Sequence, residues 1–235
     1  MSNVFAAITG ASSGIGRATA LRLAKEGCGL LLGARREREL EAVAEEARSH
    51  GGKVAFRWLD VSDPGACEAF VDEFRRRSEG ARPVLVQAAG IGFFGPAGRW
   101  DEDAARATVE TNLLGAMRIA SLSADWMRGT QGRIVHVLSI AAARTLPNSS
   151  VYSATKAGLL AFDRVLREEL RRSGVLTTSI LPGAVDTPIW EEGKGPDRKD
   201  MLSADAVAEA IVTVALAPPD RALDEIVLMP PKGIL

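Results

Sequence analysis

Apolar and polar residues follow one another along this chain in blocks. Short, continuous apolar runs, bounded by turn-forming residues, are separated by longer stretches whose apolar positions recur at helical spacing. The runs predict strands at Val4–Ile8, Gly29–Ala34, Val54–Trp58, Pro83–Gln87, Arg133–Leu138, Leu176–Leu181 and Glu225–Met229. The stretches between them predict helices at Ile15–Lys25, Glu37–His50, Pro64–Arg77, Asp101–Met127, Ser150–Arg172 and Ser203–Leu216.

The order of these elements predicts the fold class. Continuously apolar strands that alternate with helices indicate a parallel sheet covered on both faces. Right-handed crossovers then wind the chain into a doubly wound sheet, whose ligand crevice lies at the carboxyl ends of the strands. We therefore expect one α/β domain over residues 1–235, with a seven-stranded parallel sheet flanked by helices on both faces.

A glycine-rich turn follows the first predicted strand. Residues 9–16 read Thr-Gly-Ala-Ser-Ser-Gly-Ile-Gly, and a helical pattern follows directly. Such a turn lets the backbone approach a pyrophosphate and points the free N–H groups of the helix at the anion. Glycines also simply make tight turns. Between a strand and a helix, however, the turn favours a dinucleotide site formed by Gly10, Ser12, Ser13, Gly14, Ile15 and Gly16.

The only tyrosine of the chain, Tyr152, stands four residues before Lys156 and thirteen residues after Ser139. Positions four apart lie on the same face of a helix. At roughly 4 Å and an effective dielectric of about 20, an ammonium and a phenolate attract by about 4 kcal/mol, which would lower the tyrosine pKa by about 3 from ~10. Such a phenol can exchange a proton with a carbonyl or alcohol oxygen that Ser139 also holds. Taken alone, the spacing also suits a packed tyrosine and a solvated lysine.

Read together, these elements resemble the short-chain dehydrogenase/reductase family over nearly the whole chain. The resemblance is carried by Thr9–Gly16, Asp60-Val61, Ala88-Ala89-Gly90, Asn112, Ser139, Tyr152-x3-Lys156 and Pro182–Thr187, in the order of that family. It implies a single Rossmann domain and an enzyme that transfers hydride between a nicotinamide and a carbonyl or secondary alcohol. It also implies a homo-oligomer, a tetramer or a dimer.

The resemblance assigns a role to each motif. The catalytic residues would be Asn112, Ser139, Tyr152 and Lys156, with Asn112 interrupting its helix to position a proton-relaying water and Lys156 also holding the nicotinamide ribose. The adenine would contact Asp60 and Val61, and the adenosine ribose would lie along Ala88, Ala89 and Gly90. The nicotinamide would contact Pro182, Gly183, Val185 and Thr187. Asn112 could instead bond a nearby carbonyl, and Gln87 stands where the family has an Asn.

The end of the second strand bears on cofactor choice. Ala34 stands where NAD-preferring relatives carry an Asp, and Arg35 and Arg36 follow it. A guanidinium there can bind a 2′-phosphate in a bidentate manner, which favours NADP(H) and leaves NAD(H) possible. The two arginines could also just open a charged, solvated helix. Ser13 is not basic, whereas many NADP-preferring relatives have Arg or Lys there.

Composition adds few constraints. A net charge of -1 and a pI of 6.2 give no reason to expect nucleic acid or an anionic membrane as partner. No apolar stretch approaches ~20 residues and no signal sequence opens the chain, so we expect a cytoplasmic protein. Cys28 and Cys67 form no ligand pattern, so we expect no metal.

The substrate stays open at this point. The polar segment Pro188–Leu202 is either a lid or a solvated connection, and Phe93-Phe94 and Ala141–Arg144 would face the same crevice. A ketone or aldehyde, a sugar, a steroid or a carrier-bound β-ketoacyl group would each suit an open pocket. Two alternative functions remain, namely a non-catalytic NADP(H) sensor on the same fold and an NAD-dependent alcohol dehydrogenase.

Overall fold

The computed structural model describes residues 3–99, 101–190 and 195–235. Its main sheet has seven parallel strands in the order β3-β2-β1-β4-β5-β6-β9. All seven lie where the sequence predicts them, at Val4–Thr9 (β1), Gly29–Ala34 (β2), Val54–Trp58 (β3), Arg82–Gln87 (β4), Arg133–Val137 (β5), Leu176–Pro182 (β6) and Glu225–Leu228 (β9). The expected doubly wound, Rossmann-type sheet is confirmed.

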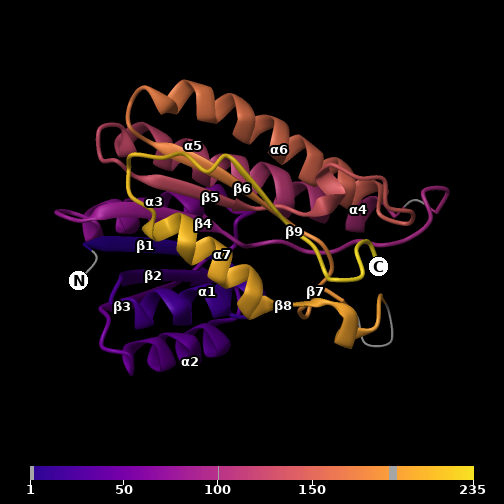
Figure 1. Ribbon diagram of the computed structural model, residues 1–235, viewed down its shortest axis with the longest axis horizontal. Helices are drawn as coiled ribbons and strands as arrows, with labels where there is room; N and C mark the ends of the chain where they lie inside the picture. The colour runs from indigo at the N-terminus through magenta and orange to yellow at the C-terminus, as the bar shows by residue number, and fades with distance from the viewer. Residues whose placement is uncertain (1–2, 100, 191–194) are drawn as a thin grey trace.

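Helices cover both faces of the sheet (Figure 1). One face carries α1 (Gly14–Lys25), α2 (Glu37–Arg48) and α7 (Ala204–Leu216). The other carries α3 (Pro64–Arg77), α5 (Ala116–Met127) and α6 (Ser150–Arg171). Because both faces are covered, the strands are apolar at nearly every position, which is the pattern that predicts a parallel sheet. None of the helices in the described ranges is long and apolar enough to cross a membrane.

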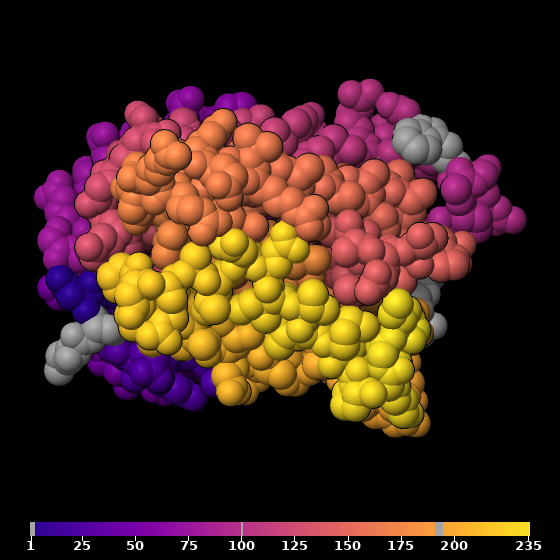
Figure 2. Space-filling view, turned by 45° about the horizontal axis from the view of Figure 1, so that its top comes forward, coloured from indigo at the N-terminus to yellow at the C-terminus, as the bar shows by residue number. Residues whose placement is uncertain are grey.

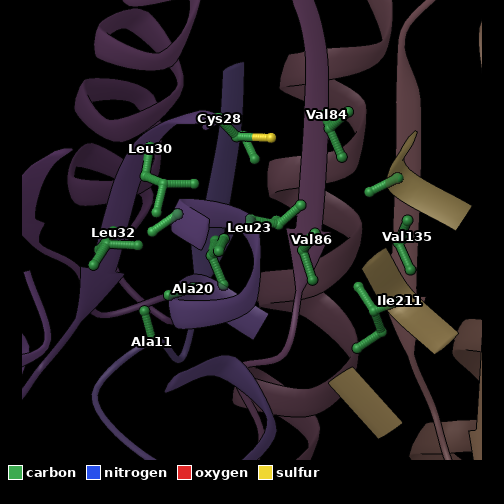
Figure 3. Close-up of a cluster of buried hydrophobic side chains, with 14 of the residues drawn as sticks. Ala11, Ala20, Leu23, Cys28, Leu30, Leu32, Val84, Val86, Val135 and Ile211 are labelled. Atoms are coloured by element: carbon green, nitrogen blue, oxygen red, sulfur yellow. The ribbon is translucent and has the colours of Figure 1, made fainter. Parts of the chain in front are cut away.

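Alternate side chains of each strand enter different cores because successive strand residues point to opposite faces. In β2, Leu30 and Leu32 face α1, whereas Leu31 faces α3. Figure 3 shows the α1 side, where fully buried residues interdigitate, among them Ala20, Leu23, Leu30, Leu32, Val84, Val86, Val135 and Ile211. This packing fixes α1, and therefore the turn that precedes it, against the sheet.

The predicted helix Asp101–Met127 is not continuous. It consists of α4 (Glu102–Val109), a π-helix η1 (Glu110–Gly115) and α5. Single π-turns inside helices occur mostly at functional sites. A Cβ at Gly115 would come 2.5 Å from the carbonyl oxygen of Val61, so the helix approaches the backbone of the β3–α3 connection very closely at this point. The interruption at Asn112, expected from the family resemblance, is confirmed.

Smaller elements at the carboxyl ends of the strands were not predicted. They are the short strands β7 (Val185–Asp186) and β8 (Leu202–Ser203), which pair with each other, and the 3-10 turns η2 (Ile140–Ala142) and η3 (Arg198–Asp200). The segment Pro188–Leu202, considered above as a lid, contains η3 and runs into β8, and residues 191–194 of it lie outside the described part. The winding order reverses between β1 and β4, so the turns after β1, β4, β5 and β6 meet at one edge.

Candidate active site

The glycine turn between β1 and α1 is shaped for close approach. Gly10 has a φ of +69°, and a Cβ there would lie 2.7 Å from the carbonyl oxygen of Ala88. A Cβ on Gly16 would lie 2.3 Å from the carbonyl oxygen of Gly10. Ser13, at the N-cap of α1, makes no side-chain capping bond, and the first turn of α1 holds no acidic residue. The N-terminus of α1 therefore fits a pyrophosphate in both its shape and its dipole.

Two exposed arginines flank this turn. Arg36 Nη2 donates to Ser13 Oγ at 2.6 Å and to Ser12 Oγ at 3.1 Å. Arg35 Nη1 lies 4.0 Å from Asp60 Oδ2, and the side chain of Arg35 is 58% exposed. The sequence argument rested mainly on Arg35, whereas the structure brings Arg36 to the serines of the turn. Both guanidinium groups line this end of the site, and of the two only Arg35 is close to the carboxylate of Asp60.

A groove of about 510 Å³ runs from the arginines to the centre of the sheet edge. It collects most of the predicted cofactor residues, namely Gly10, Ser12, Ser13, Gly14, Ile15, Gly16, Arg35, Arg36, Asp60, Val61, Ala88, Ala89, Gly90, Tyr152, Lys156 and Thr187. Three further predicted contacts, Pro182, Gly183 and Val185, line an adjoining cavity together with Thr187. The groove has the length and the backbone cradle that a dinucleotide needs.

Asp60, which lines the groove beside Arg35, is held in place by Ser62. Its Oδ1 accepts bonds from the backbone N–H of Ser62 at 2.9 Å and from Ser62 Oγ at 2.6 Å. Partial burial raises the pKa of Asp60, but the two Ser62 bonds and the charge of Arg35 outweigh it, so the pKa lies below its usual range. Asp60 does not cap α3, because Asp63 accepts the capping bonds there.

Ser139 and Tyr152 come together where the groove meets the adjoining cavity. Ser139 follows β5 and accepts a bond from the backbone N–H of Ala141 at 3.1 Å, which fixes its side chain. Tyr152 lies in the first turn of α6, and its side chain lines the same cavity as that of Ser139, whose hydroxyl lowers the pKa of Tyr152. Both side chains are at least nine-tenths buried. The predicted pair of hydroxyls is therefore adjacent and partly shielded from water.

Lys156 lies one helical turn after Tyr152, but its ammonium does not bond the phenol oxygen. Lys156 Nζ donates to the carbonyl oxygen of Val137 at 3.1 Å and lies 5.7 Å from the centre of the Tyr152 ring. A Cβ added to Gly90 would lie 3.6 Å from Lys156 Nζ and 3.3 Å from Asn112 Oδ1. Gly90 therefore leaves room at the point where Lys156 and Asn112 meet the groove.

Asn112 clamps the backbone after β4. Its Oδ1 accepts from the N–H of Ile91 at 2.8 Å, and its Nδ2 donates to the carbonyl oxygen of Ile91 at 2.8 Å. The bond to a nearby carbonyl, weighed as the alternative role for this residue, is present, although it reaches a loop and not the helix of Asn112. The water relay stays a prediction.

The expected lowering of the tyrosine pKa is wrong for this structure. Burial raises the pKa of Tyr152 to about 12, and the hydrogen bond with Ser139 offsets only part of that effect. Burial also lowers the pKa of Lys156 to about 8. The expectation assumed a direct ammonium–phenolate contact in a well-screened site. Instead, removal from water disfavours both charged forms, and the ammonium bonds a carbonyl.

A mostly apolar cavity of about 120 Å³ adjoins the Ser139–Tyr152 pair. Phe94 lines this cavity, as expected. Ala141–Arg144, which were also expected to face it, are not in the lining, and Ile140 and Leu146 line the cavity on either side of them in the sequence. Sequence reasoning missed the other members of the lining, among them Pro196, Met229, Ile234 and Leu235. The large apolar side chains directly after Thr187 and at positions 229–235 were the available signal.

Comparison with known proteins agrees with this geometry. A family model described as short chain dehydrogenase matches residues 4–196. A sepiapterin reductase from Chlorobaculum tepidum is 32% identical over 236 residues, which cover 96% of this chain and 96% of that protein. An alcohol dehydrogenase from the archaeon Thermococcus sibiricus, complexed with 5-hydroxy-NADP, is similar in structure with a TM-score of 0.88 and 33% identity over 95% of each chain.

A variant of the actinorhodin polyketide ketoreductase with NADPH has a TM-score of 0.86 and 28% identity, over 96% of this chain and 95% of that one. The family model spans most of the chain, and the matched relatives extend along nearly its whole length. This chain belongs to the short-chain dehydrogenase family and is an oxidoreductase of that type.

Proposed function

We propose that this protein is an NADP(H)-dependent reductase that interconverts a small carbonyl compound and its secondary alcohol. One observation carries the proposal. The side chains of Ser139 and Tyr152 line a cavity that suits a small apolar group, and Tyr152 also lines the adjoining groove, which suits a dinucleotide. A carbonyl in the cavity would meet the proton donor on one side and the nicotinamide end of the groove on the other.

The cofactor preference follows from charge at the adenosine end of the groove. Arg35 and Arg36 both line it, and Asp60 is the one carboxylate that lines the described groove. A 2′-phosphate would add about two negative charges there, close to two guanidinium groups that suit planar, bidentate recognition. The Thermococcus and actinorhodin proteins, whose structures contain 5-hydroxy-NADP and NADPH, support the same preference.

In the reductive direction, Ser139 and Tyr152 would hold the carbonyl oxygen. The bound nicotinamide supplies the hydride, which adds to the carbonyl carbon. Tyr152 gives its proton to the oxygen, so the product is a neutral alcohol. Because its pKa is about 12, Tyr152 is protonated at neutral pH and ready to act as the acid.

Lys156 would return the proton to Tyr152. A phenolate is costly in this buried site, and the nearest titratable cation is Lys156, whose pKa of about 8 keeps it mostly protonated at neutral pH. Its bond to the Val137 carbonyl oxygen holds the ammonium close to the tyrosine ring. Asn112, beside it at Gly90, would position the water through which Lys156 regains its proton.

No observation favours either alternative function, the non-catalytic sensor or the NAD-dependent alcohol dehydrogenase. A non-catalytic sensor would not need Ser139 and Tyr152 together in the lining of one cavity. An NAD-dependent dehydrogenase would need the buried Tyr152 to lose its proton, which its high pKa opposes, and it would place two arginines where no phosphate binds. We also propose a dimer or a tetramer, as the family resemblance implies, in which the exposed Val165 on α6 would take part in the contact.

The test follows NADPH and NADH oxidation by the purified protein with aldehydes, diketones and ketoesters. We expect turnover with NADPH that falls by about 100-fold or more in Tyr152→Phe, since a positioned proton donor contributes about 10²–10⁴-fold. The variant should still bind NADPH, measured by the change in nicotinamide fluorescence. Turnover that survives in Tyr152→Phe would refute the proposed mechanism.

A further inference from the structure

Exposed apolar side chains converge on the cavity beside Tyr152. In the described part of the chain, seven large hydrophobic side chains are exposed, and three of them, Phe94 (40%), Ile234 (55%) and Leu235 (40%), line this one cavity. Single exposed hydrophobic residues are ordinary, but a group of them around one hollow marks a ligand site. In Figure 2 the C-terminal residues lie on the surface and end beside the segment that follows β7.

An aromatic stack forms one wall of the cavity and reaches the proton donor. The rings of Phe94 and Trp190 are stacked with centres 4.9 Å apart and planes 13° apart. Phe94 is also tilted against Tyr152, with ring centres 5.3 Å apart. Trp190 is fixed because its Nε1 donates to the carbonyl oxygen of Val185 at 3.1 Å. An apolar ligand group could lie against this wall while its carbonyl oxygen meets Tyr152.

Two ion pairs join charged residues in the segments that contribute to this cavity. Lys232 Nζ bonds Asp200 Oδ1 at 2.8 Å and thereby ties the C-terminal segment to η3. Arg198 is paired with Asp186 in the same region. Among the described residues, no charged side chain lines the cavity, and its polar side chains are Ser139, Tyr152 and Thr187. A carboxylate or phosphate of the substrate would therefore lose its water without gaining a cationic partner.

We propose that the substrate is an uncharged carbonyl compound whose carbonyl carries an aromatic or branched alkyl group, packed against Phe94, Trp190 and Ile234. This inference rests on the proposed reductase function and narrows its substrate class. The cavity of about 120 Å³ is somewhat smaller than the ~150 Å³ engineered cavity that binds benzene. It therefore admits a group of ring size at most, and the rest of a longer substrate lies over the exposed rim.

The test compares three matched ketones with NADPH. Ethyl benzoylformate and benzoylformate share a ketone and a phenyl ring and differ in charge, whereas ethyl pyruvate keeps the ester and replaces the ring by a methyl group. We expect kcat/KM for ethyl benzoylformate to exceed that for benzoylformate by about 100-fold, because the cavity leaves a carboxylate unpaired. It should exceed that for ethyl pyruvate by about 10-fold or more, since one methylene in an apolar pocket already gives about 10-fold.

Two variants test whether the preference for the ester over the acid arises at the rim of the cavity. Ile234→Lys places a cation at the rim and should reduce the preference for the ester over the acid by about 10-fold. Val227→Lys is the control, because Val227 is 56% exposed, about as much as Ile234, and does not line the cavity. We expect Val227→Lys to leave the preference within twofold of the wild type.

The outcomes separate the two proposals. If no ketone is reduced, the proposed function fails and this inference fails with it. If benzoylformate is reduced as well as its ester, the reductase function stands and this inference is overturned. The inference is also overturned if Ile234→Lys behaves like Val227→Lys, or if it changes only the sedimentation of the protein, because the apolar rim would then be a contact between subunits.

Discussion

Replacing Arg36 by alanine tests how the protein distinguishes the two nicotinamide cofactors. The guanidinium of Arg36 bonds Ser12 and Ser13, the two serines before the N-terminus of α1. Its side chain is exposed, so its removal leaves the core intact. Arg35 also lines the groove, with its guanidinium 4.0 Å from Asp60. The substitution therefore removes one of two cations at the place where a 2′-phosphate would lie.

The expected loss can be estimated from this geometry. A hydrogen bond to a charged group contributes about 1.5–3 kcal/mol, which corresponds to about 10- to 150-fold in Kd. The lower half of this range applies, because Arg36 is exposed and must give up its serine partners to bind a phosphate. We therefore expect Arg36→Ala to weaken NADPH binding by about 10- to 30-fold. NADH lacks the 2′-phosphate, so its Kd should change by less than about threefold.

Fluorescence titration of NADPH and NADH measures both constants, at low and at high salt. The loss for NADPH should shrink at high salt, since exposed charges are screened. Arg38→Ala is the control, because Arg38 is exposed on α2 and does not line the groove. Ala34→Asp should shift the preference towards NADH, because it restores an acceptor for the ribose hydroxyls. Equal losses for both cofactors in Arg36→Ala would refute the assignment of this residue to the 2′-phosphate.

Three further predictions concern titration and stability. The kcat for reduction should fall about tenfold per pH unit above pH 8, because Lys156, which returns the proton to Tyr152 in each turnover, loses its own proton at a pKa of about 8; a flat profile to pH 10 would contradict the relay. Asp163→Asn should lower the free energy of unfolding, measured in urea, by about 3–5 kcal/mol, because buried Asp163 bonds Ser179 and Arg167, each at 2.6 Å. As a control, Glu168→Gln at an exposed position should change the free energy of unfolding by no more than about 0.5 kcal/mol. Burial lowers the pKa of His136 in the folded protein, so below about pH 6.5 the unfolded chain binds a proton that the folded protein does not. The free energy of unfolding should therefore fall as the pH decreases below about 6.5, and His136→Gln should make this fall less steep.

Much of this molecule can be predicted from its sequence, because its fold depends on local patterns. The apolar runs locate all seven strands of the main sheet, and the spacing of the glycines identifies a turn where side chains at Gly10 and Gly16 would collide with the backbone. The helical spacing of Tyr152 and Lys156 places both on the inner face of α6, where both are buried. Each of these features depends on residues close together in the chain.

The features that the sequence did not reveal depend on contacts between distant segments. The wall of the cavity combines Phe94, Trp190 and Ile234, which follow three different strands. Arg36 reaches the glycine turn because β2 pairs with β1 in parallel, in a register that begins with Gly29 opposite Phe5. The pKa of Tyr152 also depends on burial by several elements, so an estimate from the Tyr–Lys spacing alone predicted the wrong direction.

The burial of Tyr152 and Lys156 together bears on the direction of the proposed reaction. Oxidation of an alcohol requires Tyr152 to accept a proton, and burial disfavours the phenolate that could do so at neutral pH. Reduction requires the protonated phenol, which the same burial favours. The lysine pKa of about 8 places the residue that restores this proton close to neutrality, where it can both release and regain one. The two shifts therefore favour the same direction, and a site buried in this way is better suited to reducing carbonyls than to oxidising alcohols near pH 7.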